Sequence, residues 1–248
     1  PGLAIGSFLN VIASRVPLNL AIGSTRSECM SCGHEIRWYD NVPLVSFLVL
    51  RGRCRDCSAR IPFRYPLVEL GTAVLVALAF ASFGATAYAA LAAAFLVVLV
   101  AISAIDFEHH LIPNRIVSPV FDLTAGWQGI KDFFSALSFA NYKTLLGDWL
   151  YVSSYLRSLW VAVVSTAILL AIALIKPGGM GMGDVKLCLL LGAMLGRNVA
   201  VALFIGFIAA SVPSLYLYAR HGRAAGKMAL PLGPFLALGA TVALFFGD

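Results

Sequence analysis

Long apolar runs, separated by short polar stretches, fill most of this chain of 248 residues. Residues 66–84 and 86–105 are two such runs, and a helix that crosses a hydrocarbon core about 30 Å thick needs about 20 apolar residues. Hydrophobic residues make up 60% of the chain and charged residues only 12%, against roughly 45–50% and about 25% in soluble domains. Disordered and collagen-like chains are excluded because the apolar content is too high and the 22 Gly and 11 Pro follow no three-residue period. The chain is therefore predicted to be an all-α protein that crosses a membrane several times.

We predict about eight transmembrane helices, the first of which, residues 1–16, is expected to be truncated at its start. The other spans are expected at about 66–84, 86–105, 113–130, 159–175, 184–196, 198–219 and 229–247. Gly84 divides the first two of these into a tight helical hairpin, and a break at Arg197 and Asn198 separates two later spans. Residues 131–158 are predicted to be a loop or a helix that lies at the membrane interface.

A polar segment interrupts this pattern near the start of the chain. Eight arginines, four acidic residues and four cysteines lie between residues 15 and 64. The sequence thus predicts three parts: a partial first transmembrane helix at 1–16, a small cytoplasmic metal-binding domain at 17–65, and a transmembrane domain at 66–248.

The net charge of +6 reflects how the predicted spans distribute Lys and Arg between the two sides of the membrane. With residues 15–64 on the cytoplasmic side, all but four of the 18 Lys and Arg residues fall on that side. The exceptions are Lys131, Lys143, Arg157 and Arg197. This asymmetry is typical of the positive-inside rule. The membrane topology therefore accounts for the basic charge, and no nucleic-acid partner is expected.

Four cysteines form two Cys-x-x-Cys pairs, Cys29 with Cys32 and Cys54 with Cys57, with 21 residues between the pairs. This spacing is close to that of zinc sites in which two pairs of thiolates complete a tetrahedral shell, and a shell closed in this way is structural. Metal binding would then supply folding free energy to a segment with few apolar side chains. Two disulfides or redox chemistry are the alternatives, which a reducing cytoplasm and the lack of a βαβ pattern disfavour. The fifth cysteine, Cys188, is expected to be a small buried hydrophobic residue.

Asp106 and Asp184 stand at the ends of two predicted spans on the same side of the membrane. Ionisable residues at membrane depth are costly and are commonly functional. Two carboxylates within hydrogen-bond distance share a proton, so that one activates water while the other binds the substrate carbonyl, as in aspartyl peptidases. The alternative is that Asp184 caps its own helix and Asp106 is an interfacial residue.

Two other classes of function are also compatible with these features. A transporter would use the carboxylates as an ion site, but the chain shows no paired halves with matching broken spans, and both aspartates are at span ends. A non-enzymatic scaffold would use the cysteine segment to recruit partners.

Taken together, the motifs resemble the bacterial type IV prepilin peptidase/N-methyltransferase family, intramembrane aspartyl peptidases of the GxGD type. Five segments carry the resemblance over most of the chain. They are GSFLNVIASRVP at 6–17, the cysteine segment at 29–57, RYPLVEL at 64–70, Asp106 with LIPN at 111–114, and Gly181, Gly183, Asp184 and Lys186 before PLGPFLA at 231–237.

The resemblance implies an enzyme of the bacterial inner membrane that cleaves the leader peptide of type IV prepilins and secretion pseudopilins at the cytoplasmic face. It implies that Asp106 and Asp184 are the catalytic pair and that Cys29, Cys32, Cys54 and Cys57 bind a structural zinc ion. It also implies that the new N-terminal residue is methylated with S-adenosylmethionine. The sequence shows no nucleotide-binding fingerprint, so no residue is assigned to this methyl donor.

Overall fold

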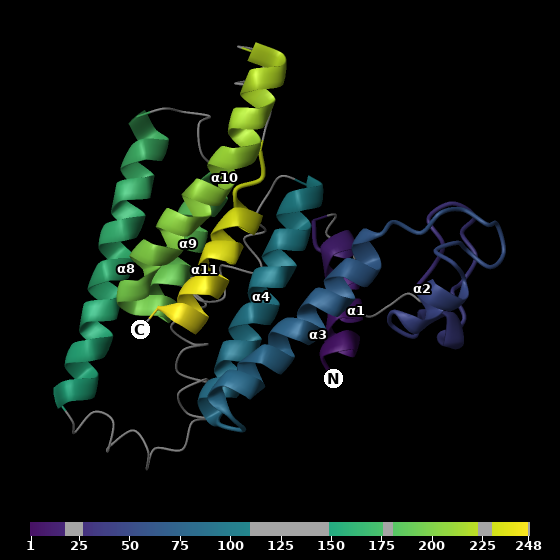
Figure 1. Ribbon diagram of the computed structural model, residues 1–248, viewed down its shortest axis with the longest axis horizontal. Coiled ribbons are helices and arrows are strands. Elements are labelled where there is room, and N and C mark those ends of the chain that lie inside the picture. Colours follow the sequence, from purple (N-terminus) through teal and green to yellow (C-terminus); the bar gives the residue numbers. More distant parts are fainter. Residues whose placement is uncertain (18–26, 110–148, 176–180, 223–229, 248) are drawn as a thin grey trace. The chain divides into compact units, whose positions relative to one another are not determined.

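The computed structural model describes residues 1–17, 27–109, 149–175, 181–222 and 230–247 (Figure 1). These residues are helical apart from turns, loops and two isolated β-bridges, which confirms the prediction of an all-α protein. The chain divides into an N-terminal unit, Pro1–His109, and a C-terminal unit, His110–Asp248.

Three apolar helices pack together in the N-terminal unit. They are α1 (Gly2–Arg15), α3 (Arg64–Phe83) and α4 (Ala87–His109), and each packs against the other two. Gly84 follows α3 with a φ of +67°, a conformation that glycine adopts without a steric cost. The chain reverses there, and α4 begins three residues further on. The predicted hairpin is therefore confirmed.

Small residues bring the backbones of α1 and α3 into close contact. A Cβ atom added to Gly2 would lie 2.6 Å from the Cα of Ala73, and one added to Gly6 would lie 2.6 Å from the Cα of Glu69. One turn further along α1, the Nδ2 of Asn10 donates a hydrogen bond to the backbone carbonyl of Tyr65 at 3.2 Å. The Gly-x-x-x-Gly spacing that permits such an approach is common where helices pack in membranes.

The cysteine loop, residues 27–63, connects α1 to α3 and contains two short helical segments. These are the 3₁₀ helix η1 (Trp38–Asn41) and α2 (Val45–Val49). Ser46 is the one residue of the cysteine loop that is buried. The loop thus has almost no hydrophobic core of its own, as the sequence predicts.

The C-terminal unit contains α8 (Trp149–Ile175), α9 (Met182–Leu195), the 3₁₀ helix η3 (Gly196–Asn198), α10 (Val199–His221) and α11 (Gly233–Phe246). Within the unit, α8 packs on α9, and α10 packs on α11. The predicted break at Arg197 and Asn198 is confirmed as η3.

The helix that contains the predicted span 159–175 begins before that span. The helix begins at Trp149, ten residues earlier, and residues 149–158 continue directly into it. No Gly or Pro separates these residues from the apolar run, so nothing in the local sequence ends a helix that has formed. The rest of the segment predicted as a loop or interfacial helix, and the span predicted at 113–130, lie outside the described residues.

Among the described residues, three helical stretches are long and apolar enough to cross a membrane: Arg64–Phe83, Ala87–His109 and Met182–His221, the last of which includes η3. Gly2–Arg15, Trp160–Ile175 and Gly233–Phe246 are shorter apolar helices. These helices support a membrane protein, and the total of eight spans stays a prediction.

Candidate active site and metal centre

Asp106 is a buried carboxylate near the C-terminal end of α4, with only 5% of its surface exposed. The last carbonyl groups of a helix carry partial negative charge, which makes this an unfavourable place for an ionised acid. Close by, Arg64 at the start of α3 donates a hydrogen bond to the carboxylate of Glu108. A buried acid kept at such a position is a strong candidate for a functional residue.

Asp184 is the third residue of α9 and is half-buried. Its Oδ2 accepts a hydrogen bond from the backbone N–H of Gly181 at 3.2 Å. Asp184 thus caps the start of its own helix, but it does so from the third position of a helix that begins at Met182, and not as the residue before a helix that begins at Val185. Capping and catalysis are compatible because a carboxylate accepts up to about four hydrogen bonds.

The first turns of α9 are held by apolar packing against α8. Val185 and Cys188 are buried in a cluster with Leu169, and Cys188 is fully buried. This packing confirms the prediction for Cys188 and fixes the helix that carries Asp184. Asp106 belongs to the N-terminal unit and Asp184 to the C-terminal unit, so their pairing stays a prediction.

The four paired cysteines come together in the cysteine loop. One ligand atom from each of Cys29, Cys32, Cys54 and Cys57 lies within 4.8 Å of the others, and all four are free thiols. The Sγ atoms of Cys29 and Cys57 are 3.8 Å apart. A tetrahedron with Zn–S bonds of 2.3 Å has edges of about 3.8 Å. The donor set and its size thus fit a structural zinc ion.

The two cysteine pairs sit in matching backbone turns. In the first turn, Cys29 N–H donates to the carbonyl of His34 at 2.9 Å, and Gly33 N–H donates to the carbonyl of Cys29 at 2.8 Å. In the second turn the equivalent bonds run from Cys54 N–H to Ala59 (2.8 Å) and from Ser58 N–H to Cys54 (3.0 Å). Each turn thereby directs its two sulfur atoms toward one centre.

The thiols of Cys29 and Cys57 have very different pKa values because their hydrogen bonds and their desolvation differ. Hydrogen bonds from the backbone N–H groups of Ser31 and Cys32 lower the pKa of Cys29 to about 6. The backbone N–H of Ala59 favours the thiolate of Cys57, but desolvation and hydrogen bonds with the other three thiols prevail and raise its pKa to about 12. A cation bound between the sulfur atoms would favour the thiolate form of Cys57.

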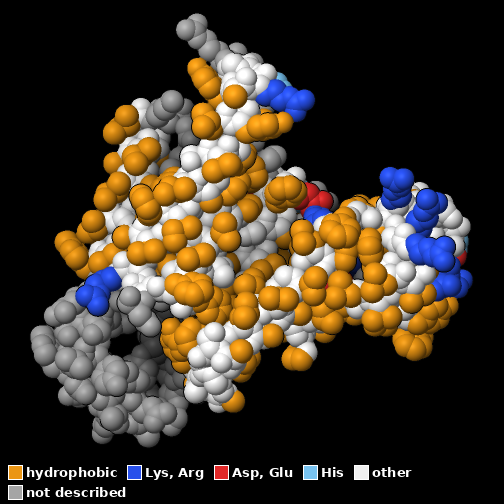
Figure 2. All heavy atoms as spheres, in the orientation of Figure 1, with side chains coloured by type: hydrophobic (Ala, Val, Ile, Leu, Met, Phe, Trp, Pro, Cys, Tyr) orange, Lys and Arg blue, Asp and Glu red, His pale blue; other side chains and the backbone are white. Residues whose placement is uncertain are grey.

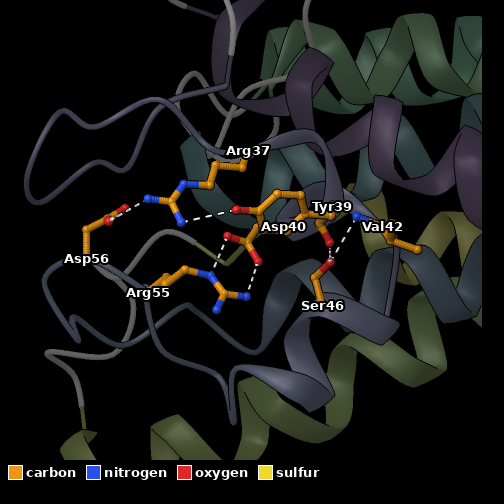
Figure 3. Close-up of polar contacts among 7 residues, drawn as sticks. All are labelled: Arg37, Tyr39, Asp40, Val42, Ser46, Arg55 and Asp56. Carbon is orange, nitrogen blue, oxygen red and sulfur yellow. Dashed lines mark hydrogen bonds and ion pairs between the residues drawn. The ribbon is translucent and has the colours of Figure 1, made fainter.

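A network of charged side chains joins the second cysteine turn to η1 (Figure 3). Arg55 donates two hydrogen bonds to Asp40, at 2.8 and 2.6 Å, and these lower the pKa of that carboxyl group. Arg37 donates to the hydroxyl of Tyr39 at 3.1 Å and lies 3.7 Å from Asp56. Because the two arginine side chains are exposed to solvent, which screens their charge, each pair stabilises the loop only modestly.

A cavity of about 600 Å³ lies between α1, the cysteine loop and the start of α3. Its lining includes Asn10, Arg15, Ser46 and Glu69. Glu69 is buried, and its Oε2 accepts a hydrogen bond from the backbone N–H of Leu44 at 2.8 Å, immediately before α2.

Sequence reasoning did not identify this cavity. The acid in RYPLVEL and the asparagine in GSFLNV are polar residues in apolar runs, which is the signal that could have revealed the cavity. Because the two residues are far apart in the sequence, the sequence alone does not show that they line the same cavity.

Family models match most of the chain. The Bacterial Peptidase A24 N-terminal domain matches residues 1–83, and the Type IV leader peptidase family matches residues 93–215. No solved structure gives a significant match.

Curated relatives align with the chain from end to end. A prepilin leader peptidase/N-methyltransferase of Burkholderia pseudomallei is 34% identical over 99% of this chain and 83% of the relative. The protein of the same name from Bacillus subtilis is 34% identical over 100% and 92%, and that from Pseudomonas aeruginosa is 35% identical over 100% and 88%. The resemblance seen in the sequence is thereby confirmed, and the chain belongs to the type IV leader peptidase family.

Proposed function

We propose that this protein is a prepilin leader peptidase and N-methyltransferase that acts on prepilins or pseudopilins at the cytoplasmic face of the inner membrane. The end-to-end similarity to relatives that carry both activities in their names supports this proposal. The positive-inside distribution of Lys and Arg supports the cytoplasmic placement of the cysteine loop.

Peptide cleavage is assigned to Asp106 and Asp184. In this proposal one carboxylate removes a proton from water while the other, protonated, binds the carbonyl oxygen of the scissile peptide. The observation that carries the assignment is the burial of Asp106 at the end of a membrane helix, where an acid without a function is costly.

The metal is assigned a structural role. Cys29, Cys32, Cys54 and Cys57 would hold zinc in a closed set of four thiolates, which leaves no position for a substrate. The ion would link the two cysteine turns of a loop that has one buried residue.

The proposal is tested with full-length protein in membranes, a prepilin substrate and labelled S-adenosylmethionine. Asp106→Asn and Asp184→Asn should each abolish the loss of leader mass because Asn keeps the size of the side chain but cannot serve as a base. The Oδ1 of Asn can still accept the hydrogen bond from the backbone N–H of Gly181, so the second substitution keeps the helix start intact.

Cysteine-loop metal content and protein yield serve as controls for folding. Cleavage at the normal rate in either variant would refute the aspartyl mechanism. If the wild-type protein removes the leader but the product gains no methyl group, the proposed methyltransferase activity is refuted and the proposed peptidase activity is not.

A further inference from the structure

The cavity in the N-terminal unit has the properties of a small-molecule site. Its volume of about 600 Å³ falls in the range of ligand pockets. The loop, α1 and α3 all contribute to its wall, and both polar and apolar side chains line it.

Two buried oxygen acceptors in the wall indicate the charge of the ligand. Asn10 is 3% exposed, and its Oδ1 is buried without a hydrogen-bond partner. The Nδ2 of Asn10 donates to the carbonyl of Tyr65, which fixes the orientation of the amide. The atom of the amide without a partner is therefore the acceptor, Oδ1. Glu69 is 8% exposed and adds a carboxylate. Buried acceptors of this kind favour a ligand that carries positive charge and N–H donors.

We propose that this cavity binds the methyl donor, with Glu69 and Asn10 as its binding residues, an inference that rests on the proposed N-methyltransferase activity. S-adenosylmethionine carries a sulfonium and an ammonium group, which match a carboxylate and an amide oxygen. Arg15 lines the same cavity and provides a positive charge for the donor's carboxylate.

The chemistry supplied by the bound donor is the transfer of one methyl group. As the amine lone pair of the pilin forms the N–CH₃ bond, the S–CH₃ bond breaks, its electron pair stays on sulfur in S-adenosylhomocysteine, and the amine loses a proton to water.

Equilibrium binding of S-adenosylmethionine to the purified full-length protein tests this assignment. Glu69→Gln keeps an acceptor for Leu44 but removes the charge, and Asn10→Ala removes the unpaired oxygen together with the hydrogen bond to Tyr65. Each should weaken binding at least tenfold while prepilin cleavage and metal content stay normal. Glu35→Gln, on the exposed part of the same lining, is the matched control and should weaken binding less.

The outcomes separate the two proposals. Binding within twofold of wild type in both variants would overturn the assignment of the cavity. A wild-type protein that cleaves prepilin but binds no methyl donor would instead refute the methyltransferase function. S-adenosylhomocysteine lacks the sulfonium charge, so Glu69→Gln should weaken its binding less than that of the donor.

A second inference concerns the outer face of α2, the helix that separates the cavity from the surroundings. Ser46 and Phe47 line the cavity. Val45, Leu48 and Val49, at helical spacing on another face, are 55%, 73% and 68% exposed. A helix with one apolar face exposed in this way is typical of a membrane interface.

The position of α2 along α3 supports a membrane environment. The 20 residues of α3 span about 30 Å, which is about the thickness of the hydrocarbon core. Glu69 is five residues beyond Arg64, the first residue of α3, and therefore lies about 7.5 Å further along the helix axis. The hydrogen bond from Leu44 to Glu69 places the start of α2 at that level.

The residues around α2 in the N-terminal unit are also apolar. Phe63, just before α3, is 70% exposed and packs edge-on against Phe47, with ring centroids 6.0 Å apart. Leu67 and Leu70 on α3 are also exposed. In Figure 2 the basic side chains of the cysteine loop gather at its outer end, whereas hydrophobic side chains cover its lower edge.

We infer that α2 lies in the bilayer interface, with Val45, Leu48 and Val49 in contact with lipid. The apolar face of α2 is then continuous with the lipid-facing side of α3. Interfacial helices bury their apolar face about 5–10 Å into the boundary between headgroups and acyl chains, which agrees with the level set by Glu69.

Photo-crosslinking of the full chain in lipid vesicles tests this inference. The amino acid p-benzoylphenylalanine replaces Leu48, Leu67 or Met30 in three separate variants, and mass spectrometry identifies the adducts. Leu67 on α3 is the lipid-facing control, and Met30, 92% exposed in the first cysteine turn, is the water-facing control. Position 48 should give lipid adducts at a yield within threefold of position 67, and position 30 should give none.

The inference is overturned if position 67 captures lipid while position 48 captures only protein or nothing. Metal content of each variant shows whether the loop is folded. Fluorescence quenching by brominated lipids is an independent test, with the variants Leu48→Trp and Leu67→Trp. Weaker quenching of the tryptophan at position 48 than of that at position 67 would overturn the inference.

Discussion

At the scale of single residues, the two cysteine turns differ at the position that takes a positive φ. Gly33 has a φ of +69° and the equivalent Ser58 has a φ of +57°. A residue with a Cβ pays a steric cost there that glycine does not. Ser58→Gly should therefore stabilise the metal-bound loop by about 1 kcal/mol, measured as slower transfer of zinc to a chelator.

The converse substitution is the control for this prediction. Gly33→Ala should accelerate zinc loss, since no atom lies within 4 Å of the added Cβ and only the backbone conformation is affected. Equal rates of zinc loss in all three proteins would show that backbone strain does not limit the stability of the site.

The residue types in the site were readable from the sequence. Two Cys-x-x-Cys pairs predict a closed metal site because sulfur ligands need this spacing, and the structure brings all four together. The roles of Asn10 and Glu69 could not be read in the same way. A polar residue in an apolar run indicates function, but its partner is known only once the helices are packed.

At the scale of helices, the contact between α1 and α3 depends on the glycines of α1. A Cβ at Gly6 would lie 2.6 Å from the Cα of Glu69, a backbone atom that cannot move without the helix. Gly6→Ala should separate the two helices and destabilise the protein by about 1–3 kcal/mol. Thermal unfolding of the full chain in detergent measures the effect.

Gly71 provides a matched control on the opposite helix. An added Cβ there meets nothing within 4 Å, so Gly71→Ala should leave the unfolding temperature unchanged or raise it slightly. A loss of stability as large as that of Gly6→Ala would mean that the close approach of α1 and α3 does not control the effect.

Apolar runs and glycines in the sequence predict where the helices lie, but they predict the ends of the helices less well. The sequence places the hairpin at Gly84 and the break at Arg197, and both are observed. It misplaces the start of α8 because hydropathy marks where a helix is apolar, not where its hydrogen bonding begins. The short helix α2 was not predicted at all, since five residues show no period.

At the scale of the whole molecule, the arrangement predicts that methylation depends on the metal more than cleavage does. The cysteine loop contributes much of the cavity wall, and the proposed metal ion would supply much of the loop's folding free energy. Asp106 and Asp184 are on α4 and α9, outside the loop. Chelation of the metal should therefore abolish binding of S-adenosylmethionine and retain most prepilin cleavage.

Limited proteolysis measures the state of the loop in the same samples. Cleavage within residues 27–63 should increase at least tenfold after chelation, and added zinc should reverse the increase. Unchanged proteolysis with the metal fully removed would contradict the structural role of the metal.

The sequence by itself determined that the chain is helical, that it belongs in a membrane, and that two pairs of cysteines have the spacing of a metal site. These properties depend on residue type and local spacing, because hydropathy, helical period and ligand spacing act over a few residues to a few turns. Tertiary structure alone decided that α1 lies on α3, that Asn10 and Glu69 line one cavity, and that α2 exposes an apolar face. Those features arise from the close packing of helix backbones and from hydrogen bonds between residues up to 55 positions apart, which no local pattern encodes.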